Sequence, residues 1–184
     1  MTYYIIKYTG TFGYIKPWTA VRDEKTFSQQ FLTPSIIAGM SQKIFGLGEK
    51  ERILRHRLNY ARIDLQKELA HPKWRKDPQA KGFPERGIML HPHLYLAFAS
   101  ESDAQEAFSQ HLCLCRNEDI ILPDPDHGIQ MLTETEFDAI IGFELKFNES
   151  DHIFPVGYNR YEADYPMMYG KLFIQGDPVR NQEL

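Results

Sequence analysis

The sequence predicts an α+β fold of the ferredoxin-like type with added β elements. Three observations predict this fold. Strand and helix patterns alternate along the chain, a basic segment over residues 48–88 separates the first helix from the next strand, and several short β-type segments follow the second helix. The chain has 184 residues, which is the length of one domain. We therefore expect residues 1–184 to form a single domain with an excursion at about 48–88.

The first two elements have clear signals. Residues 3–9 are aromatic and β-branched, which predicts a strand. Residues 33–46 predict a helix, because Thr33 suits an N-cap, Pro34 suits the first helical position and Gly46 suits a left-handed C-cap. The apolar stripe of this helix repeats at helical spacing and consists of Ile36, Ile37, Met40 and Ile44.

The segment over residues 48–88 has a different character. It is basic, it lacks strong apolar periodicity, and prolines and glycines interrupt it. These features predict a protruding excursion from the core.

The remaining elements return to core-like patterns. Residues 89–99 predict a buried strand, and Ser100 or Ser102 can cap a second helix, with Gln105 completing a capping box from Ser102. Further β-type segments occupy residues 119–122, 137–147, 152–158 and 168–174.

Charge is distributed unevenly along the chain. Residues 43–86 contain twelve basic and six acidic side chains, whereas residues 101–184 contain five basic and seventeen acidic ones. This polarity predicts a polyanion as partner of the first region and a protein partner at the second, although solvated charged faces are the alternative. The C-terminal apolar contacts would come from Tyr158, Tyr161, Tyr165, Met167, Met168 and Tyr169.

Composition also limits the chemistry. No stretch approaches the roughly 18 apolar residues of a membrane helix, so no membrane partner is expected. Cys113 and Cys115 are too close in sequence to favour a structural disulfide, and a reducing cytoplasm is the expected location. Their Cys-x-Cys spacing is also atypical of zinc sites. We expect no metal and no cofactor.

One block of sequence carries a family resemblance. It comprises Lys16-Pro-Trp-Thr-Ala-Val-Arg22, Thr26-Phe27, Phe31-Leu-Thr-Pro-Ser-Ile-Ile-Ala-Gly39 and Phe45-Gly46. It resembles the N-terminal half of the fifth CRISPR-associated protein family of the RAMP superfamily, in which a Thr-Phe loop precedes a Pro-Ser helix start with an internal glycine.

Two later segments add weaker matches. Residues 114–123, Leu-Cys-Arg-Asn-Glu-Asp-Ile-Ile-Leu-Pro, resemble the family's stretch after the second helix, except that Cys115 stands where glycine is often found. Residues 154–156, Phe-Pro-Val, resemble a late Leu-Pro-Val strand. The chain is short for the family, which puts the extent of the thumb and of the C-terminal additions in doubt.

The resemblance implies a ferredoxin-like (RRM-like) domain with a basic thumb inserted after the first helix and additional C-terminal β-strands. It implies a non-catalytic scaffold subunit of a type I CRISPR antiviral surveillance complex of the Cascade type. Such a subunit binds the 5′ handle of the CRISPR RNA and contacts the backbone subunits and the large subunit. Target DNA near the protospacer-adjacent motif would be a further partner.

The candidate RNA-binding residues come from two regions. Basic side chains can neutralise phosphates, aromatic ones can stack on bases, and a helix N-terminus favours an anion. Pairing of the arginines with Glu49, Glu51, Asp64 and Glu68, and a plain helix cap, are the alternatives. The loop and first helix contribute Arg22, Lys25, Phe27, Ser35 and Lys43. The excursion contributes Arg52, Arg55, His56, Arg57, Arg62, Trp74, Arg75, Lys76, Lys81 and Arg86.

Two rival functions remain open at this point. One branch of the family cleaves precursor RNA without metal, and Tyr60 with His56, or His71 with Lys73, could supply the acid and base. Neither pair matches the branch's motif, so we expect no catalytic residues. The second rival is a protein-interaction module that does not bind nucleic acid.

Overall fold

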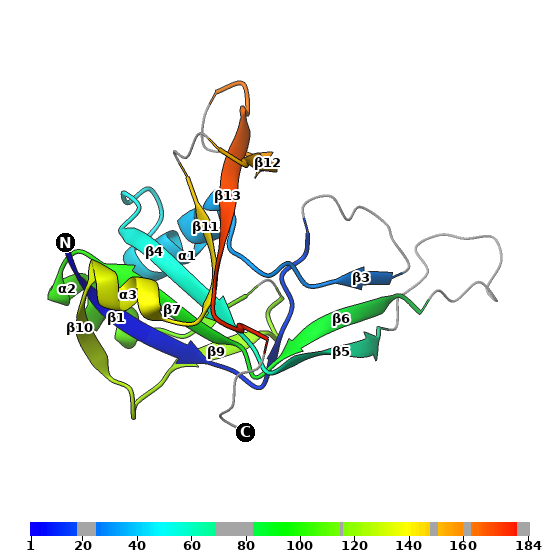
Figure 1. The fold of residues 1–184 in the computed structure, drawn as a ribbon, viewed down its shortest axis with the longest axis horizontal. Helices are drawn as coiled ribbons and strands as arrows, with labels where there is room; N and C mark the ends of the chain where they lie inside the picture. Colours follow the sequence, from blue (N-terminus) through cyan, green and yellow to red (C-terminus); the bar gives the residue numbers. More distant parts are fainter. Residues whose placement is uncertain (18–24, 69–82, 115, 148–150, 160–162, 180–184) are drawn as a thin grey trace.

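The computed structural model describes residues 1–17, 25–68, 83–114, 116–147, 151–159 and 163–179. Its fold is mixed α+β, with a large antiparallel sheet and few helices (Figure 1). Its helices are α1 (Pro34–Phe45), α2 (Glu101–Phe108) and α3 (Glu134–Ala139).

The main sheet has nine strands within the described residues. Its order is β12-β13-β11-β4-β7-β1-β9-β8, and β10 pairs with β1 beside β9. All these pairings are antiparallel. The strands are β1 (Thr2–Thr9), β4 (Ile53–Asn59), β7 (His93–Phe98), β8 (Leu112–Cys113), β9 (Ile120–Pro123), β10 (Ile129–Thr133), β11 (Gly142–Lys146), β12 (Phe154–Tyr158) and β13 (Met167–Gln175).

The two faces of this sheet carry separate apolar clusters, because neighbouring residues of a strand point to opposite sides. Ile6 and Tyr8 of β1 belong to the large core that includes α1 and α2. Tyr3 and Ile5 instead pack with Phe137 of α3 on the other face. The sheet is therefore covered by α1 and α2 on one side and partly by α3 on the other.

A second, smaller sheet projects from the main one (Figure 1). We call it the arm. In it β6 pairs with β5 and β2 antiparallel and with β3 parallel. Its strands are β2 (Phe12–Gly13), β3 (Lys25–Phe27), β5 (Arg62–Lys67) and β6 (Glu85–Leu90).

Several predicted elements are confirmed. Residues 3–9 form β1, and the helix predicted at 33–46 is α1, with Pro34 in its first turn. Thr33 takes the N-cap position but its side chain makes no capping hydrogen bond, and Gly46 ends the helix at a φ of 107° and a ψ of 159° rather than in a left-handed turn. The strands predicted at 119–122, 152–158 and 168–174 are β9, β12 and β13.

Two of the other predicted elements differ from the structure. The strand predicted at 89–99 is divided by a turn at His91, whose φ is 48°, so that β6 ends at residue 90 and β7 begins at residue 93. The strand predicted at 137–147 begins as helix α3 and becomes strand only at β11. The missed signal is a capping box in which Thr133 and Glu136 bond each other's backbone N–H groups.

The predicted excursion at 48–88 needs a larger correction. Residues 53–59 are not part of a protrusion but form β4, a central strand paired with β7 and β11. Of the described residues in this range, β5 and β6 leave the main sheet, as continuations of β4 and β7 into the arm. The sequence did not indicate β4 as a buried strand, because the run Arg-His-Arg at residues 55–57 is polar although Arg57 and His56 are buried.

Candidate nucleic-acid interface

One face of the arm combines apolar and basic side chains. Phe27 of β3, Gly87 of β6 and Leu65 of β5 are neighbours in register, so they lie in one row across the sheet and share a face. Lys25 and Lys67 lie in the adjacent row, on either side of Glu85. The arm therefore presents an aromatic ring and an aliphatic side chain beside two lysines.

The glycine at the centre of this row allows the Phe27 ring to lie close to the sheet. A Cβ atom built on Gly87 would be 2.3 Å from Cδ1 of Phe27, which is closer than any side chain permits. Phe27 nevertheless remains 50% exposed, and Leu65 is 48% exposed. A ring held against a flat backbone with half its surface free is suited to stacking on a planar partner.

The basic residues of the arm differ in how far they are committed to other contacts. Lys25 lies with its Nζ 3.7 Å from Glu85 and 5.6 Å from the centre of the Phe27 ring. Arg62 and Lys67 are exposed on β5. Arg86 points to the opposite face, where its guanidinium contacts Glu68 at 3.5 Å and donates to Thr26. Lys25 and Lys67 are thus accessible to a polyanion on the face of Phe27, whereas Arg62 is exposed on the opposite face.

Part of this face was not predicted from the sequence. Lys25 and Phe27 were among the predicted RNA-binding residues, as were Arg62 and Arg86 of the opposite face, but Leu65 and Lys67 were not. The available signal was the alternating run Arg-Ile-Asp-Leu-Gln-Lys at residues 62–67, which is typical of a strand with one face in solvent.

The candidates near the first helix lie apart from one another. The Ser35 hydroxyl is 3.1 Å from that of Thr33 at the start of α1. Lys43, in the last turn of the same helix, donates to the side chain of Gln110, which follows α2. The structure therefore places Ser35 and Lys43 at opposite ends of α1 rather than in one site. Five further candidates lie outside the described residues, namely Arg22, Trp74, Arg75, Lys76 and Lys81.

Four candidates from the basic run are engaged within the molecule. Arg52 bonds Glu49, a pairing that the alternative predicted, and also Asp103. His56 is 1% exposed and Arg57 is fully buried. Arg55 is occupied by two carboxylates. His56 and Arg57 therefore do not line a surface that an RNA strand could reach in this conformation, because β4 is central in the sheet.

Arg55 and Arg57 belong to an internal charge cluster. Arg55 donates from Nε and Nη2 to the two carboxylate oxygens of Glu144, at 2.8 and 2.7 Å, and also contacts Asp138 at 2.6 Å. Nη1 of Arg57 lies 3.2 Å from Glu144, and its guanidinium lies 4.5 Å from the centre of the Phe173 ring. Burial opposes the charge of Arg55, but its bonds to Glu144 and Asp138 raise its pKa. Glu144 is thus the shared anion of two buried guanidinium groups.

His56 is held neutral by its surroundings. Burial, and then the positive charges of Arg57 and Arg55, lower its pKa to about 3. Its Nε2 accepts backbone N–H groups from Leu32 at 3.3 Å and Leu145 at 3.4 Å. A protonated ring could not accept these bonds. The histidine therefore joins the loop before α1 to strand β11 and does so only in its neutral form.

This arrangement predicts a pH dependence of stability. An unfolded histidine titrates near 6.5, whereas the folded one titrates at about 3. The unfolded chain therefore binds the extra proton between these values. We expect the stabilisation to be complete above pH 6.5 and to fall by about 1.4 kcal/mol for each pH unit below it. Urea unfolding of the wild type and of His56→Gln at several pH values measures this slope. Equal slopes in the two proteins would contradict the prediction.

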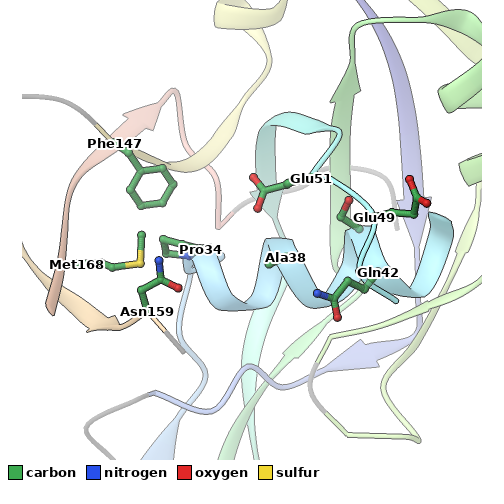
Figure 2. A pocket seen from close by; sticks show the side chains of 10 residues that line it. Pro34, Ala38, Gln42, Glu49, Glu51, Phe147, Asn159 and Met168 are labelled. Carbon is green, nitrogen blue, oxygen red and sulfur yellow. The ribbon is translucent and has the colours of Figure 1, made fainter. Parts of the chain in front are cut away.

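A cleft of about 540 Å³ lies elsewhere, beside α1 (Figure 2). Pro34, Ala38 and Gln42 of α1 form one wall, and Phe147 and Met168 lie across from the start of the helix. Glu49 and Glu51 also line it, and burial raises the pKa of Glu51. Two carboxylates and an apolar wall make this cleft unfavourable for phosphate.

Metal-binding clusters and membrane-spanning helices are both absent from the part of the chain that the structure describes. In it, no three His, Cys, Asp or Glu side chains are grouped so that they could hold a metal ion. None of its helices is both long and apolar enough to cross a membrane.

Comparison with known proteins gives a likeness of fold. No protein-family model matches the chain, and no curated protein matches it. Twelve chains of solved structures do match. One belongs to a structure titled "CRISPR RNA-guided surveillance complex", with a TM-score of 0.56 and 10% sequence identity, and the match covers 96% of this chain and 91% of that one. The similarity of fold therefore extends over nearly the whole length of both chains.

Proposed function

We propose that this chain is a non-catalytic RNA-binding subunit of a CRISPR surveillance complex and that it holds the 5′ handle of the CRISPR RNA. The single observation that carries the proposal is the basic and aromatic face of the arm. The likeness of fold to a chain of a CRISPR RNA-guided surveillance complex supports the setting. A cytoplasmic location and contacts with backbone subunits, the large subunit and target DNA near the protospacer-adjacent motif are parts of the same proposal.

The order of elements supports a ferredoxin-like core for this subunit. When the arm strands and the short β8 are left aside, the order along the chain is β1, α1, β4, β7, α2 and β9. Across the sheet the order of these strands is β9-β1-β7-β4. Such a split βαβ arrangement is the ferredoxin-like pattern. The arm extends the hairpin between β4 and β7, which supports the proposal that it serves as the thumb of this subunit.

The chemistry of the arm fits single-stranded RNA. Bases that leave a duplex can stack on an exposed ring such as Phe27, and lysines beside the ring can neutralise the adjoining phosphates. Lys25 is placed to neutralise a phosphate next to a base stacked on Phe27, because its Nζ is 5.6 Å from the centre of that ring. A handle held in this way would be bound through its backbone and its unstacked bases.

Burial of the proposed catalytic pair supports a non-catalytic role. Tyr60 is 1% exposed and its hydroxyl accepts a hydrogen bond from Gln30. His56 is buried and its Nε2 is occupied by two backbone groups. Neither side chain is accessible to the 2′-hydroxyl of an RNA strand in this conformation. The other pair considered, His71 with Lys73, lies outside the described residues.

The proposal is tested by binding of the purified protein to a labelled repeat-derived 5′-handle RNA and to a scrambled RNA of the same length, across a salt series. Preference for the handle, without cleavage, is the expected result. Rapid metal-independent cutting of the cognate repeat would establish the endoribonuclease alternative instead. Failure to bind either RNA at low salt would contradict the proposal and favour a protein-interaction module.

The two lysines beside Phe27 give a quantitative prediction. Each of Lys25→Gln and Lys67→Gln is expected to lower the salt dependence of handle binding, with the slope of log K against log salt reduced by about 0.7 for each lost phosphate contact on a single strand. Lys50→Gln is the matched control, because Lys50 is also exposed but follows α1, outside the arm. Equal slopes for all three variants would remove the arm from the RNA interface.

A further inference from the structure

Two lysines face each other on the outer part of the main sheet. Lys146 of β11 and Lys171 of β13 are direct cross-strand neighbours, so their side chains lie on the same face. Like charges in this position destabilise a sheet. An anion bound beside the two ammonium groups would offset this repulsion.

The protein supplies only part of that neutralisation. Nζ of Lys146 lies 3.8 Å from Asp138, which also receives Arg55. Among the described residues, Lys171 makes no ion pair. This face thus carries four cations, Arg55, Arg57, Lys146 and Lys171, and two carboxylates, Asp138 and Glu144. Lys171 is the one of these four that has no carboxylate partner among the described residues.

Aromatic surface adjoins these charges. Phe173 lies two residues after Lys171 on the same face, and Nζ of Lys146 is 4.5 Å from the centre of its ring. Tyr169 lies two residues before Lys171, also on that face, and is 52% exposed. Its neighbour on β12 is Pro155, which is exposed as well. One face of β13 therefore presents Tyr169, Lys171 and Phe173 in turn. The Tyr169 ring is half exposed, whereas Arg57 and Lys146 lie over the Phe173 ring.

We infer that Lys146, Lys171 and Tyr169 form a second nucleic-acid-binding surface, on which the two ammonium groups hold a phosphate of a single strand and the tyrosine ring stacks on a neighbouring base. The surface belongs to the main sheet, whereas the handle face proposed above belongs to the arm (Figure 1). It does not depend on handle binding by the arm. A nucleic acid that contacts both surfaces would follow the protein from one sheet to the other.

The composition of the surface favours nucleic acid over an acidic protein. Carboxylates of a protein partner would satisfy the lysines but would gain little from a half-exposed ring placed beside them. A nucleotide supplies both an anion and an aromatic base, so it uses the lysine pair and Tyr169 together. The neutral neighbours Pro155 and Phe173 add flat apolar surface, and the partly exposed carboxylate nearest to Lys146, that of Asp138, is already bound by Arg55.

The test uses the full chain and a fluorescent oligouridylate of about twelve nucleotides, a length within the range that such surfaces cover. Lys146→Gln and Lys171→Gln are each expected to weaken binding about fivefold at 0.1 M salt, because one lost counterion-releasing contact on a single strand changes the affinity by that factor. Tyr169→Ala is expected to weaken binding and Tyr169→Phe to retain it. Lys50→Gln serves as the charge control.

Thermal unfolding separates this role from a structural one. Removing one of two facing lysines relieves repulsion, so Lys171→Gln is expected to keep or raise Tm while it lowers RNA affinity. The same probe is applied to Lys25→Gln and Lys67→Gln, so that failure of this surface and failure of the arm are distinguishable. Unchanged affinity in the Lys146 and Lys171 variants would overturn the inference. Equal displacement of the probe by polyglutamate of the same charge would also overturn it, in favour of an acidic protein partner.

Discussion

Replacement of Glu144 by Gln is expected to lower the free energy of unfolding by about 3–5 kcal/mol, because removal of one member of a buried ion pair leaves an uncompensated charge. Glu144 is 2% exposed, accepts two hydrogen bonds from Arg55 and lies 3.2 Å from Arg57. Its loss would leave Asp138 as the nearest anion for both guanidinium groups. Urea unfolding monitored by circular dichroism measures the change.

Asp138→Asn is the matched control for this prediction. Asp138 contacts the same two arginines but its side chain is 41% exposed, so solvent can replace part of its effect. We expect a clearly smaller loss of stability than for Glu144→Gln. Equal losses in the two variants would mean that Glu144 is not the principal counter-ion of Arg55 and Arg57. A stable Glu144→Gln protein would show that the cluster is solvated rather than buried.

Phe27→Ala is expected to weaken binding of the handle RNA by about 1–3 kcal/mol, which corresponds to roughly 5- to 150-fold in affinity, because a base would lose its stacking partner. The ring is half exposed and rests against the backbone of Gly87. Fluorescence anisotropy with the labelled handle RNA measures the change.

The arm provides a close control for this variant. Leu65 lies in the same row across Gly87, is exposed to nearly the same extent and has no aromatic face. We expect Leu65→Ala to have little effect, Phe27→Trp to retain binding and Phe27→Leu to lose it. If Phe27→Leu binds as well as the wild type, the ring acts by packing on the arm and stacking is not its role. Thermal unfolding of each variant checks that the arm remains folded.

Arginines that are close in sequence differ in burial, and this difference explains why a count of basic residues does not locate an RNA surface. Arg55 and Arg57 both belong to β4, and side chains two residues apart on a strand share a face. That face is covered where Glu144 and Phe137 lie against it, so both arginines have intramolecular partners. Arg62, only five residues later, is exposed because the chain has by then left the main sheet for the arm.

The same reasoning changes the interpretation of the C-terminal part. Its large excess of acidic residues predicted a protein partner for this part of the chain. Strand pairing between β11 and β13 nevertheless brings two of its few lysines together on one face. The averaged charge of a segment is therefore a poor guide to the local charge of a sheet surface.

Local sequence by itself determined the elements with strong short-range signals. Pro34 and the apolar spacing of Ile37, Met40 and Ile44 specified α1, and the aromatic and β-branched run at residues 3–9 specified β1. The resemblance at residues 16–46 predicts a CRISPR-associated subunit, and it made Lys25 and Phe27 candidates for RNA binding. These signals depend on neighbours within a few positions, which one sequence displays directly.

Only the tertiary structure decided which charges face solvent. Whether an arginine binds RNA or Glu144 depends on residues that are more than eighty positions away and that reach it through strand pairing. The capping box before α3 was visible in the sequence, but the path of β4 through the centre of the sheet was not. In the sequence, the arginines of β4 suggest a solvent-exposed segment. The carboxylates that neutralise them, and so allow their burial, belong to distant elements of the chain.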